Sequence, residues 1–98
     1  LEGALDSLTV SPSSITTGGT VTITWTGASN PTALDWIGVF VNGEPNENYY
    51  WAIYTGGAAS GSVDFSGIVD AGTYVFRYLI DDGYISIGQS DTVTVSTP

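Results

Sequence analysis

The longest apolar run in the chain covers residues 35–41 and predicts a central β-strand. It is rich in β-branched and aromatic residues, and the turn signal Asn42-Gly43 follows it. Because side chains alternate along a strand, the run divides into two faces. These are Ile37, Val39 and Val41 on one side, and Trp36, Gly38 and Phe40 on the other. Both faces are expected to be largely covered, with Gly38 allowing a neighbouring ring to approach closely.

The other apolar segments also follow the period of a strand. Residues 20–26 alternate between threonine and apolar side chains, which indicates a sheet with one wet face. Pro12 breaks the first strand, and Gly88 predicts a β-bulge in the last. The predicted strands cover residues 6–16, 20–26, 35–41, 49–55, 62–65, 73–80 and 84–95.

A local signal at residues 70–74, Asp-Ala-Gly-Thr-Tyr, is typical of a tyrosine corner. In such a corner the ring of Tyr74 is buried and its hydroxyl bonds back to the preceding loop. Trp25 and Trp36 are assigned to the core together with Tyr74. Seven short strands with regular turn signals and this corner predict an all-β, immunoglobulin-like antiparallel β-sandwich. The length allows a single domain over residues 1–98.

The charge balance limits the partners of this domain. Ten acidic residues stand against a single cation, Arg77, with no lysine or histidine, and the net charge is −9. This charge repels nucleic acid and anionic membranes, and scattered acidic residues favour a solvated monomer. The composition is typical of extracellular modules, and no run approaches the ~20 apolar residues of a membrane span. Since no signal peptide begins the chain, we expect a mature fragment of a secreted protein.

Catalysis and metal binding are not expected. Without histidine or cysteine, Ser-His-Asp and Cys-His arrangements are impossible. Carboxylate pairs such as Asp81 and Asp82 remain, but neighbouring side chains point apart, and so small a sandwich is expected to offer little cleft. The sequence Asp81-Asp82-Gly83 lacks the spacing of a calcium loop and is interpreted as a hairpin tip. No catalytic residue, metal ligand or cofactor is therefore predicted.

Aromatic side chains are the candidate binding residues. Tyr50 and Tyr54 fall on one strand face, about 13 Å apart, opposite Trp51 and Ile53. Exposed rings spaced along a strand can stack on sugars while polar neighbours bond the hydroxyls. The predicted ligand-binding residues are Tyr50, Tyr54, Asn46 and Asn48. Neutral polysaccharide fits the negative surface, whereas the alternative is that the tyrosines are structural or pack on a neighbouring domain.

Several motifs together resemble a known family. These are the segment Asp-Trp-Ile-Gly-Val-Phe at residues 35–40, the Tyr-Tyr-Trp patch at 49–51, and the segments 71–78 and 82–84. They look like the immunoglobulin-like domain that precedes the catalytic domain in purple acid phosphatases and related metallophosphoesterases, and they are also similar to the SKICH domain. The resemblance implies a non-catalytic accessory module of a larger secreted hydrolase. Such a module is a spacer or docks on a neighbouring domain of the same chain.

Overall fold

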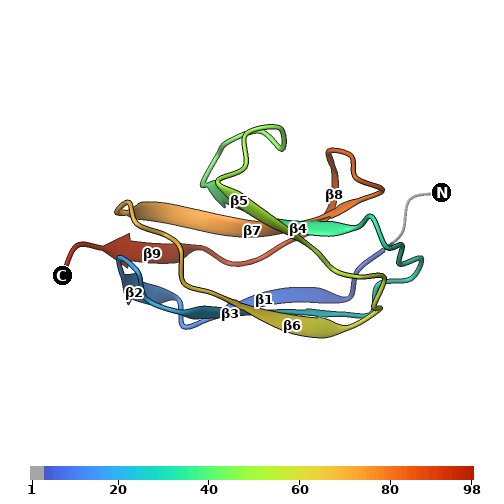
Figure 1. Cartoon of the computed structure of the whole chain (residues 1–98), viewed down its shortest axis with the longest axis horizontal. Helices are drawn as coiled ribbons and strands as arrows, with labels where there is room; N and C mark the ends of the chain where they lie inside the picture. Colours follow the sequence, from blue (N-terminus) through green and yellow to red (C-terminus); the bar gives the residue numbers. More distant parts are fainter. Residues whose placement is uncertain (1–3) are drawn as a thin grey trace.

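The computed structural model describes residues 4–98, which form nine β-strands and no helix (Figure 1). These residues accordingly hold no helix able to cross a membrane. The strands are β1 (Ser7–Ser11), β2 (Ser14–Thr16), β3 (Val21–Thr26), β4 (Trp36–Val41), β5 (Trp51–Tyr54), β6 (Gly61–Phe65), β7 (Gly72–Ile80), β8 (Ile85–Gln89) and β9 (Val93–Ser96). The prediction of an all-β fold is confirmed.

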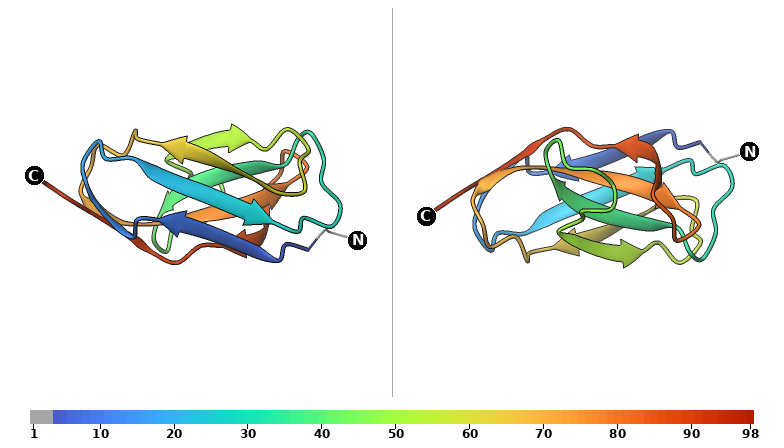
Figure 2. Two further views of the ribbon diagram at one scale, coloured as in Figure 1. Left: turned by 90° about the horizontal axis from the view of Figure 1, so that it is seen from below. Right: turned by 90° about the horizontal axis from the view of Figure 1, so that it is seen from above.

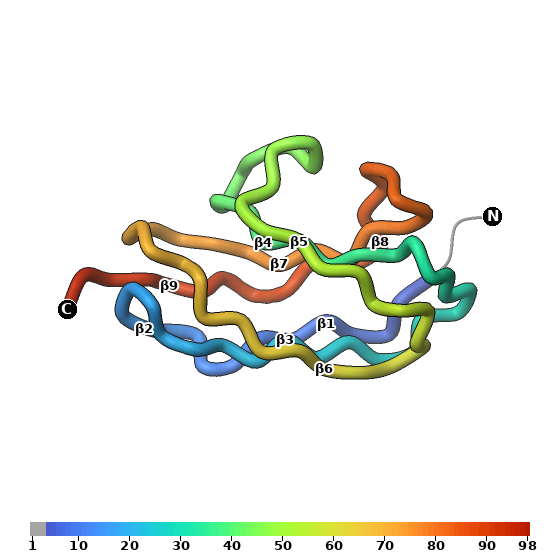
Figure 3. The backbone as a smooth tube through the Cα atoms, in the orientation of Figure 1, coloured from blue at the N-terminus to red at the C-terminus, as the bar shows by residue number. Residues whose placement is uncertain are grey.

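The strands form two facing sheets, as the three views in Figures 1 and 2 show. One sheet has the order β1-β3-β6, and the other has the order β2-β9-β7-β4-β5 with β8 paired to β7. Strand pairs are antiparallel apart from β2 with β9. Two loops, β4–β5 and β7–β8, rise from the outer side of the larger sheet (Figure 3). The predicted sandwich is thus observed, with two projections on one of its outer faces.

The first and last predicted strands are each divided in two. The segment 6–16 forms β1, which pairs with β3, and β2, which pairs with β9 in the other sheet. The segment 84–95 forms β8 and β9, which pair with successive parts of β7. Tyr78 pairs with Gly88 while Leu79 pairs with Ser86, so Ile87 is the extra residue of a bulge. The break at Pro12 and the bulge at Gly88 are both confirmed.

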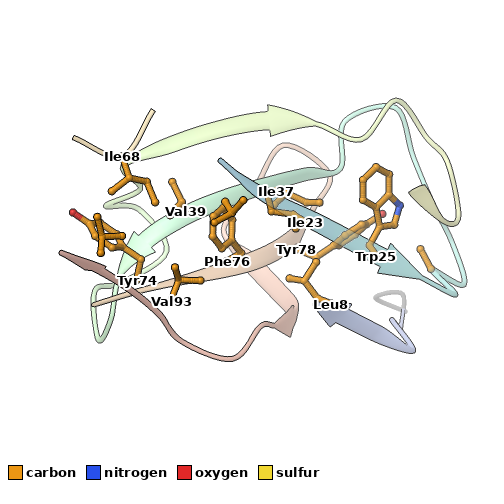
Figure 4. Close-up of a cluster of buried hydrophobic side chains, with 13 residues drawn as sticks. Leu8, Ile23, Trp25, Ile37, Val39, Ile68, Tyr74, Phe76, Tyr78 and Val93 are labelled. Atoms are coloured by element: carbon orange, nitrogen blue, oxygen red, sulfur yellow. The ribbon is translucent and has the colours of Figure 1, made fainter. Parts of the chain in front are cut away.

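The main core lies between the sheets and joins β3 to β4 and β7 (Figure 4). The polar and apolar alternation of β3 buries every second side chain there, as the sequence predicts. The central members of the core are Val21, Ile23, Trp25, Ile37, Val39, Phe76 and Tyr78. Val41 was expected beside Ile37 and Val39, but it is exposed because β4 ends there and the chain turns back, with Glu44 donating its N–H to the Val41 carbonyl at 3.0 Å.

The opposite face of β4 has its own small cluster. Trp36 and Phe40 pack there with Val75 and Leu79, on the outer side of the larger sheet. Trp36 is buried, as predicted, but outside the core between the sheets. A Cβ atom on Gly38 would lie 2.7 Å from Cζ3 of Trp36 and 2.9 Å from Cε1 of Phe40. The predicted role of Gly38 is therefore confirmed: it lets two rings close over the strand.

The tyrosine corner is also present. Tyr74 is 2% exposed, and its hydroxyl donates to the Asp70 carbonyl at 2.7 Å. Burial, with smaller contributions from Tyr50 and Asp70, raises the pKa of Tyr74. The corner fixes the loop that brings the chain from β6 of one sheet into β7 of the other.

We predict that Phe40→Ala lowers the free energy of unfolding by about 3–5 kcal/mol, because a fully buried ring leaves a cavity. Urea denaturation followed by far-UV circular dichroism measures this loss. Val41→Ala, at the exposed end of the same strand, is the matched control and should cost much less. Equal effects of the two substitutions would show that Phe40 is not a core residue.

Candidate ligand-binding cleft

A cleft of about 440 Å³ lies on the outer face of the larger sheet, beside β5. Its lining includes Trp36 and Tyr54 from the strands, Tyr49 from the β4–β5 loop, and Asp82 and Tyr84 from the β7–β8 turn. The two loops that project in Figure 3 therefore contribute to one site. The expectation that the sandwich offers little cleft was wrong, because these loops build walls above the sheet.

The aromatic rings of the cleft are arranged around Trp36. The ring centroid of Tyr49 is 5.2 Å from that of Trp36 at an interplanar angle of 67°, and Tyr84 is 6.1 Å away at 87°. Such edge-to-face pairs are favourable contacts for aromatic quadrupoles. The indole N–H donates to the Gly83 carbonyl at 2.9 Å, which fixes Trp36 against the turn. About half of each tyrosine side chain stays exposed.

The acidic end of the cleft is the β7–β8 turn. Asp81 and Asp82 both have φ of 55°, and Gly83 donates its N–H to the Ile80 carbonyl at 3.0 Å. Two left-handed central residues are typical of a hairpin turn, which confirms the interpretation of this segment as a hairpin tip. The hydroxyl of Tyr54 donates to Asp82 at 2.6 Å, and this hydrogen bond raises the pKa of Tyr54. Residues 4–98 contain no group of three or more acidic side chains placed to hold a metal ion.

Asp35 lies beneath this turn and is 1% exposed. Its carboxylate accepts hydrogen bonds from the Thr32 N–H at 3.0 Å, the Thr32 hydroxyl at 2.9 Å, the Tyr78 hydroxyl at 2.7 Å and the Asp81 N–H at 3.1 Å. Burial alone would raise the pKa of Asp35, but the donated hydrogen bonds outweigh it, so the pKa is lowered from 3.8. Burial and the hydrogen bond to Asp35 raise the pKa of Tyr78 to about 12.

Sequence reasoning missed this role of Asp35. The available signal was a carboxyl group directly before a strand that is apolar on both faces, with a threonine three residues earlier. A charge at such a position is buried and needs several donors. Asp35 ties together the loop before β4, strand β7 and the β7–β8 turn, so it positions one wall of the cleft.

The predicted outward pair of tyrosines is not observed. The hydroxyl of Tyr50 donates to the Asp70 carboxylate at 3.1 Å and accepts from the Val69 N–H at 3.2 Å, while its ring packs edge-on against Tyr74. Tyr50 borders the cleft, but it is bound to the tyrosine corner. The physical reason is that β5 begins at Trp51, so the alternation counted back from Tyr54 does not extend to Tyr50.

The two predicted asparagines have different positions. The amide of Asn46 donates to the Tyr84 carbonyl at 2.8 Å, and its oxygen accepts from Arg77 at 3.0 Å. Asn46 therefore braces the β4–β5 loop against the β7–β8 turn. Asn48 donates its backbone N–H to the Pro45 carbonyl at 3.0 Å and does not line the cleft. Of the four predicted residues, Tyr54 has an exposed ring in the cleft.

The lining also includes residues that had not been proposed as ligand-binding residues, among them Trp36, Tyr49, Asp82 and Tyr84. Tyr49 and Tyr84 were predicted to begin strands, but β5 begins at Trp51 and β8 at Ile85, so both tyrosines lie in loops, where strand alternation does not set the side-chain direction. Trp51 and Ile53 were expected on the opposite side from Tyr54, and they pack against the core between the sheets. The ring of Trp51 stacks on Phe65 at 4.0 Å between centroids.

Comparison with solved structures supports the fold. The chain is similar to the "Human OSCAR ligand-binding domain", with a TM-score of 0.54 and 18% sequence identity. The match covers 98% of this chain and 50% of that chain, so this chain spans about half the length of its structural relative. The similarity shows an immunoglobulin-like fold.

No protein-family model matches the chain, and no curated protein matches it. The resemblance to the domain of purple acid phosphatases and to the SKICH domain therefore stays a prediction.

We predict that Asp35→Asn lowers the free energy of unfolding by about 1.5–3 kcal/mol at neutral pH, since hydrogen bonds to a charged acceptor are lost. The pH dependence follows from the lowered pKa of Asp35 in the folded state. The ionised group stabilises the fold above its unfolded value, and this contribution is lost as the pH falls through the folded value. Urea denaturation between neutral pH and about pH 2 should show that the free energy of unfolding falls more steeply with decreasing pH in the wild type than in Asp35→Asn.

Asp64→Asn is the control for this comparison. Asp64 is an exposed carboxylate of β6 that accepts one hydrogen bond from Thr22. Its variant should keep the acid dependence of the wild type. Identical pH profiles for the wild type and Asp35→Asn would contradict the role of Asp35.

Proposed function

We propose that this chain is a non-catalytic accessory module of a larger extracellular protein, and that it docks a partner or a neighbouring domain in the aromatic cleft. The observation that carries the proposal is that three half-exposed tyrosines, Tyr49, Tyr54 and Tyr84, gather around Trp36 in one cleft. Isolated exposed aromatic residues are ordinary, whereas a group of them in a formed cleft is typical of binding sites.

The rings of the cleft are held in place before any ligand arrives. Tyr49 and Tyr84 pack on the buried indole of Trp36, and Tyr54 is hydrogen-bonded to Asp82. Ordered aromatic side chains lose little conformational entropy on binding, which favours affinity.

The chemistry of the cleft supports a non-catalytic role. Among the described residues that line the cleft, Asp82 is the only aspartate, glutamate, lysine or arginine. Glycoside hydrolysis needs two carboxyl groups across the substrate, and the chain has no histidine or cysteine for other hydrolytic mechanisms. The resemblance to the accessory domain of metallophosphoesterases supports a secreted hydrolase as the larger protein, one that acts on phosphoesters or polysaccharide.

Binding of neutral polysaccharide is the second candidate function. It is favoured by the exposed ring of Tyr54, which is 53% accessible at the edge strand β5. Tyr84, at 49%, adds a second ring on the other side of the cleft. The predicted partners Tyr50 and Asn46 are engaged within the domain, which leaves fewer groups to bond the hydroxyls of a sugar.

Hydroxyl-radical footprinting tests the docking function. In the isolated domain, Tyr49, Tyr54 and Tyr84 should be oxidised readily because each is about half exposed. In the larger parent protein, or with its partner bound, the same residues should be protected several-fold. Val69, which is 67% exposed outside the cleft, serves as the internal control. Equal oxidation of the cleft tyrosines in both samples would contradict docking.

A pull-down on insoluble cellulose, xylan and chitin tests the second candidate. Polysaccharide binding predicts retention of the wild type and its loss in Tyr54→Ala and Tyr84→Ala proteins with nearly unchanged melting temperature. Asn48→Ala, outside the cleft, is the control. Retention on none of these polymers would exclude the carbohydrate function and leave docking.

A further inference from the structure

We propose that the group bound in the cleft is an arginine side chain presented by the partner protein. This inference rests on the proposed docking function and specifies its chemistry. Three features of the described residues carry it: the aromatic walls, the free carboxylate at the rim, and the way in which the same face of the sheet already holds the guanidinium of Arg77.

The aromatic walls suit a guanidinium better than a pyranose ring. Tyr49 and Tyr84 stand at 67° and 87° to the indole of Trp36, so the three rings are not coplanar and do not form a level platform. A pyranose stacks on a flat aromatic surface. A guanidinium is instead attracted by several ring faces at once through their quadrupoles, and arginine makes such contacts more often than lysine.

The rim of the cleft offers an anionic acceptor. Within residues 4–98, the Asp82 carboxylate accepts one side-chain hydrogen bond, from Tyr54 to Oδ1, so Oδ2 is free to accept from a ligand. The backbone N–H of Asp82 donates to the Leu34 carbonyl at 2.7 Å, which fixes this residue in place. A guanidinium can donate to such a carboxylate while its plane lies against a ring. The net charge of −9 would also steer a basic partner toward the domain.

Arg77 shows how this face of the sheet accommodates a guanidinium. Its Cζ atom lies 4.4 Å from the ring centroid of Phe40, next to Trp36 on the outer face of β4. Oxygen atoms surround the group: it donates to the Glu44 carbonyl at 2.6 Å, to Asn46 at 3.0 Å and to Gln89 at 2.9 Å. The cleft repeats this combination of ring faces and oxygen acceptors. Because Arg77 is the only lysine or arginine in these 98 residues, a cation bound in the cleft comes from outside this domain.

Nuclear magnetic resonance titration of the ¹⁵N-labelled domain tests the inference. The probes are the capped peptides Gly-Arg-Gly-Arg-Gly, Gly-Lys-Gly-Lys-Gly and Gly-Glu-Gly-Glu-Gly, and cellohexaose. The arginine peptide should shift the indole signal of Trp36 and the amide signals of Tyr49 and Tyr84, and its affinity should fall as salt is added. The indole signal of Trp25, in the core between the sheets, should stay in place.

A matched pair of variants distinguishes binding in the cleft from attraction by the overall negative charge of the domain. Asp82→Asn removes the acceptor charge at a left-handed position that asparagine tolerates, and it should weaken the arginine peptide about tenfold, as expected for one charge-assisted hydrogen bond. Asp64→Asn makes the same charge change on β6, in the other sheet, and should keep the affinity within about twofold. Tyr84→Leu should weaken binding as well.

Several results would overturn the inference. Equal losses in Asp82→Asn and Asp64→Asn would mean non-specific attraction, and equal binding of the lysine peptide would remove the assignment to arginine. If cellohexaose moves the cleft signals and the arginine peptide does not, the ligand is a sugar and the cleft remains a binding site. If no probe moves them, the inference is wrong, and the footprinting experiment decides separately whether the cleft docks a partner.

Discussion

The buried carboxylate of Asp35 is the constraint on which the functional face depends. A charge that is 1% exposed is costly unless donors surround it, and here four hydrogen bonds converge on it. The donors come from three separate segments, so the charge is satisfied only when the loop at Thr32, strand β7 and the turn at Asp81 are assembled together. Loss of any one segment removes at least one of the four hydrogen bonds to the buried charge, which makes the assembly cooperative.

Strand β4 connects this constraint to the rest of the domain, because it is covered on both faces. Ile37 and Val39 contribute to the core between the sheets, while Trp36 and Phe40 belong to a second cluster on the outer face. An ordinary sandwich leaves the outer face of an antiparallel sheet to water. Here Gly38 allows the rings of Trp36 and Phe40 to close over the strand. The outer cluster then supports the β4–β5 and β7–β8 loops.

The parts of the fold that follow from a strict residue period could be predicted from the sequence. The alternation in residues 20–26, the tyrosine corner at Tyr74 and the bulge at Gly88 each depend on a local rule, and the structure confirms them. The candidate site could be predicted only in part. Tyr54 lies within a strand and was placed in the correct direction, whereas Tyr50 lies just outside that strand.

Loop residues account for what the sequence could not show. The side chain of Asn46 was expected to meet a ligand, yet it bonds to Tyr84 and Arg77, which are 38 and 31 residues away. The donors of Asp35 are likewise distant in sequence apart from Thr32. Such pairings depend on how two loops meet in space, and no residue period or short motif encodes them.

The bracing of the two loops explains why the cleft is formed without a ligand. Arg77 donates to the Glu44 carbonyl and to Asn46 of the β4–β5 loop, and Asn46 in turn holds the backbone of Tyr84 in the β7–β8 turn. Arg77 is thus used inside the domain, beneath the loops, while most of the acidic side chains that the structure describes, though not Asp35, are exposed. This division of charge leaves the cleft with aromatic rings and one carboxylate. The ordering of both walls is complete before binding, so its entropic cost does not weaken the affinity for a partner.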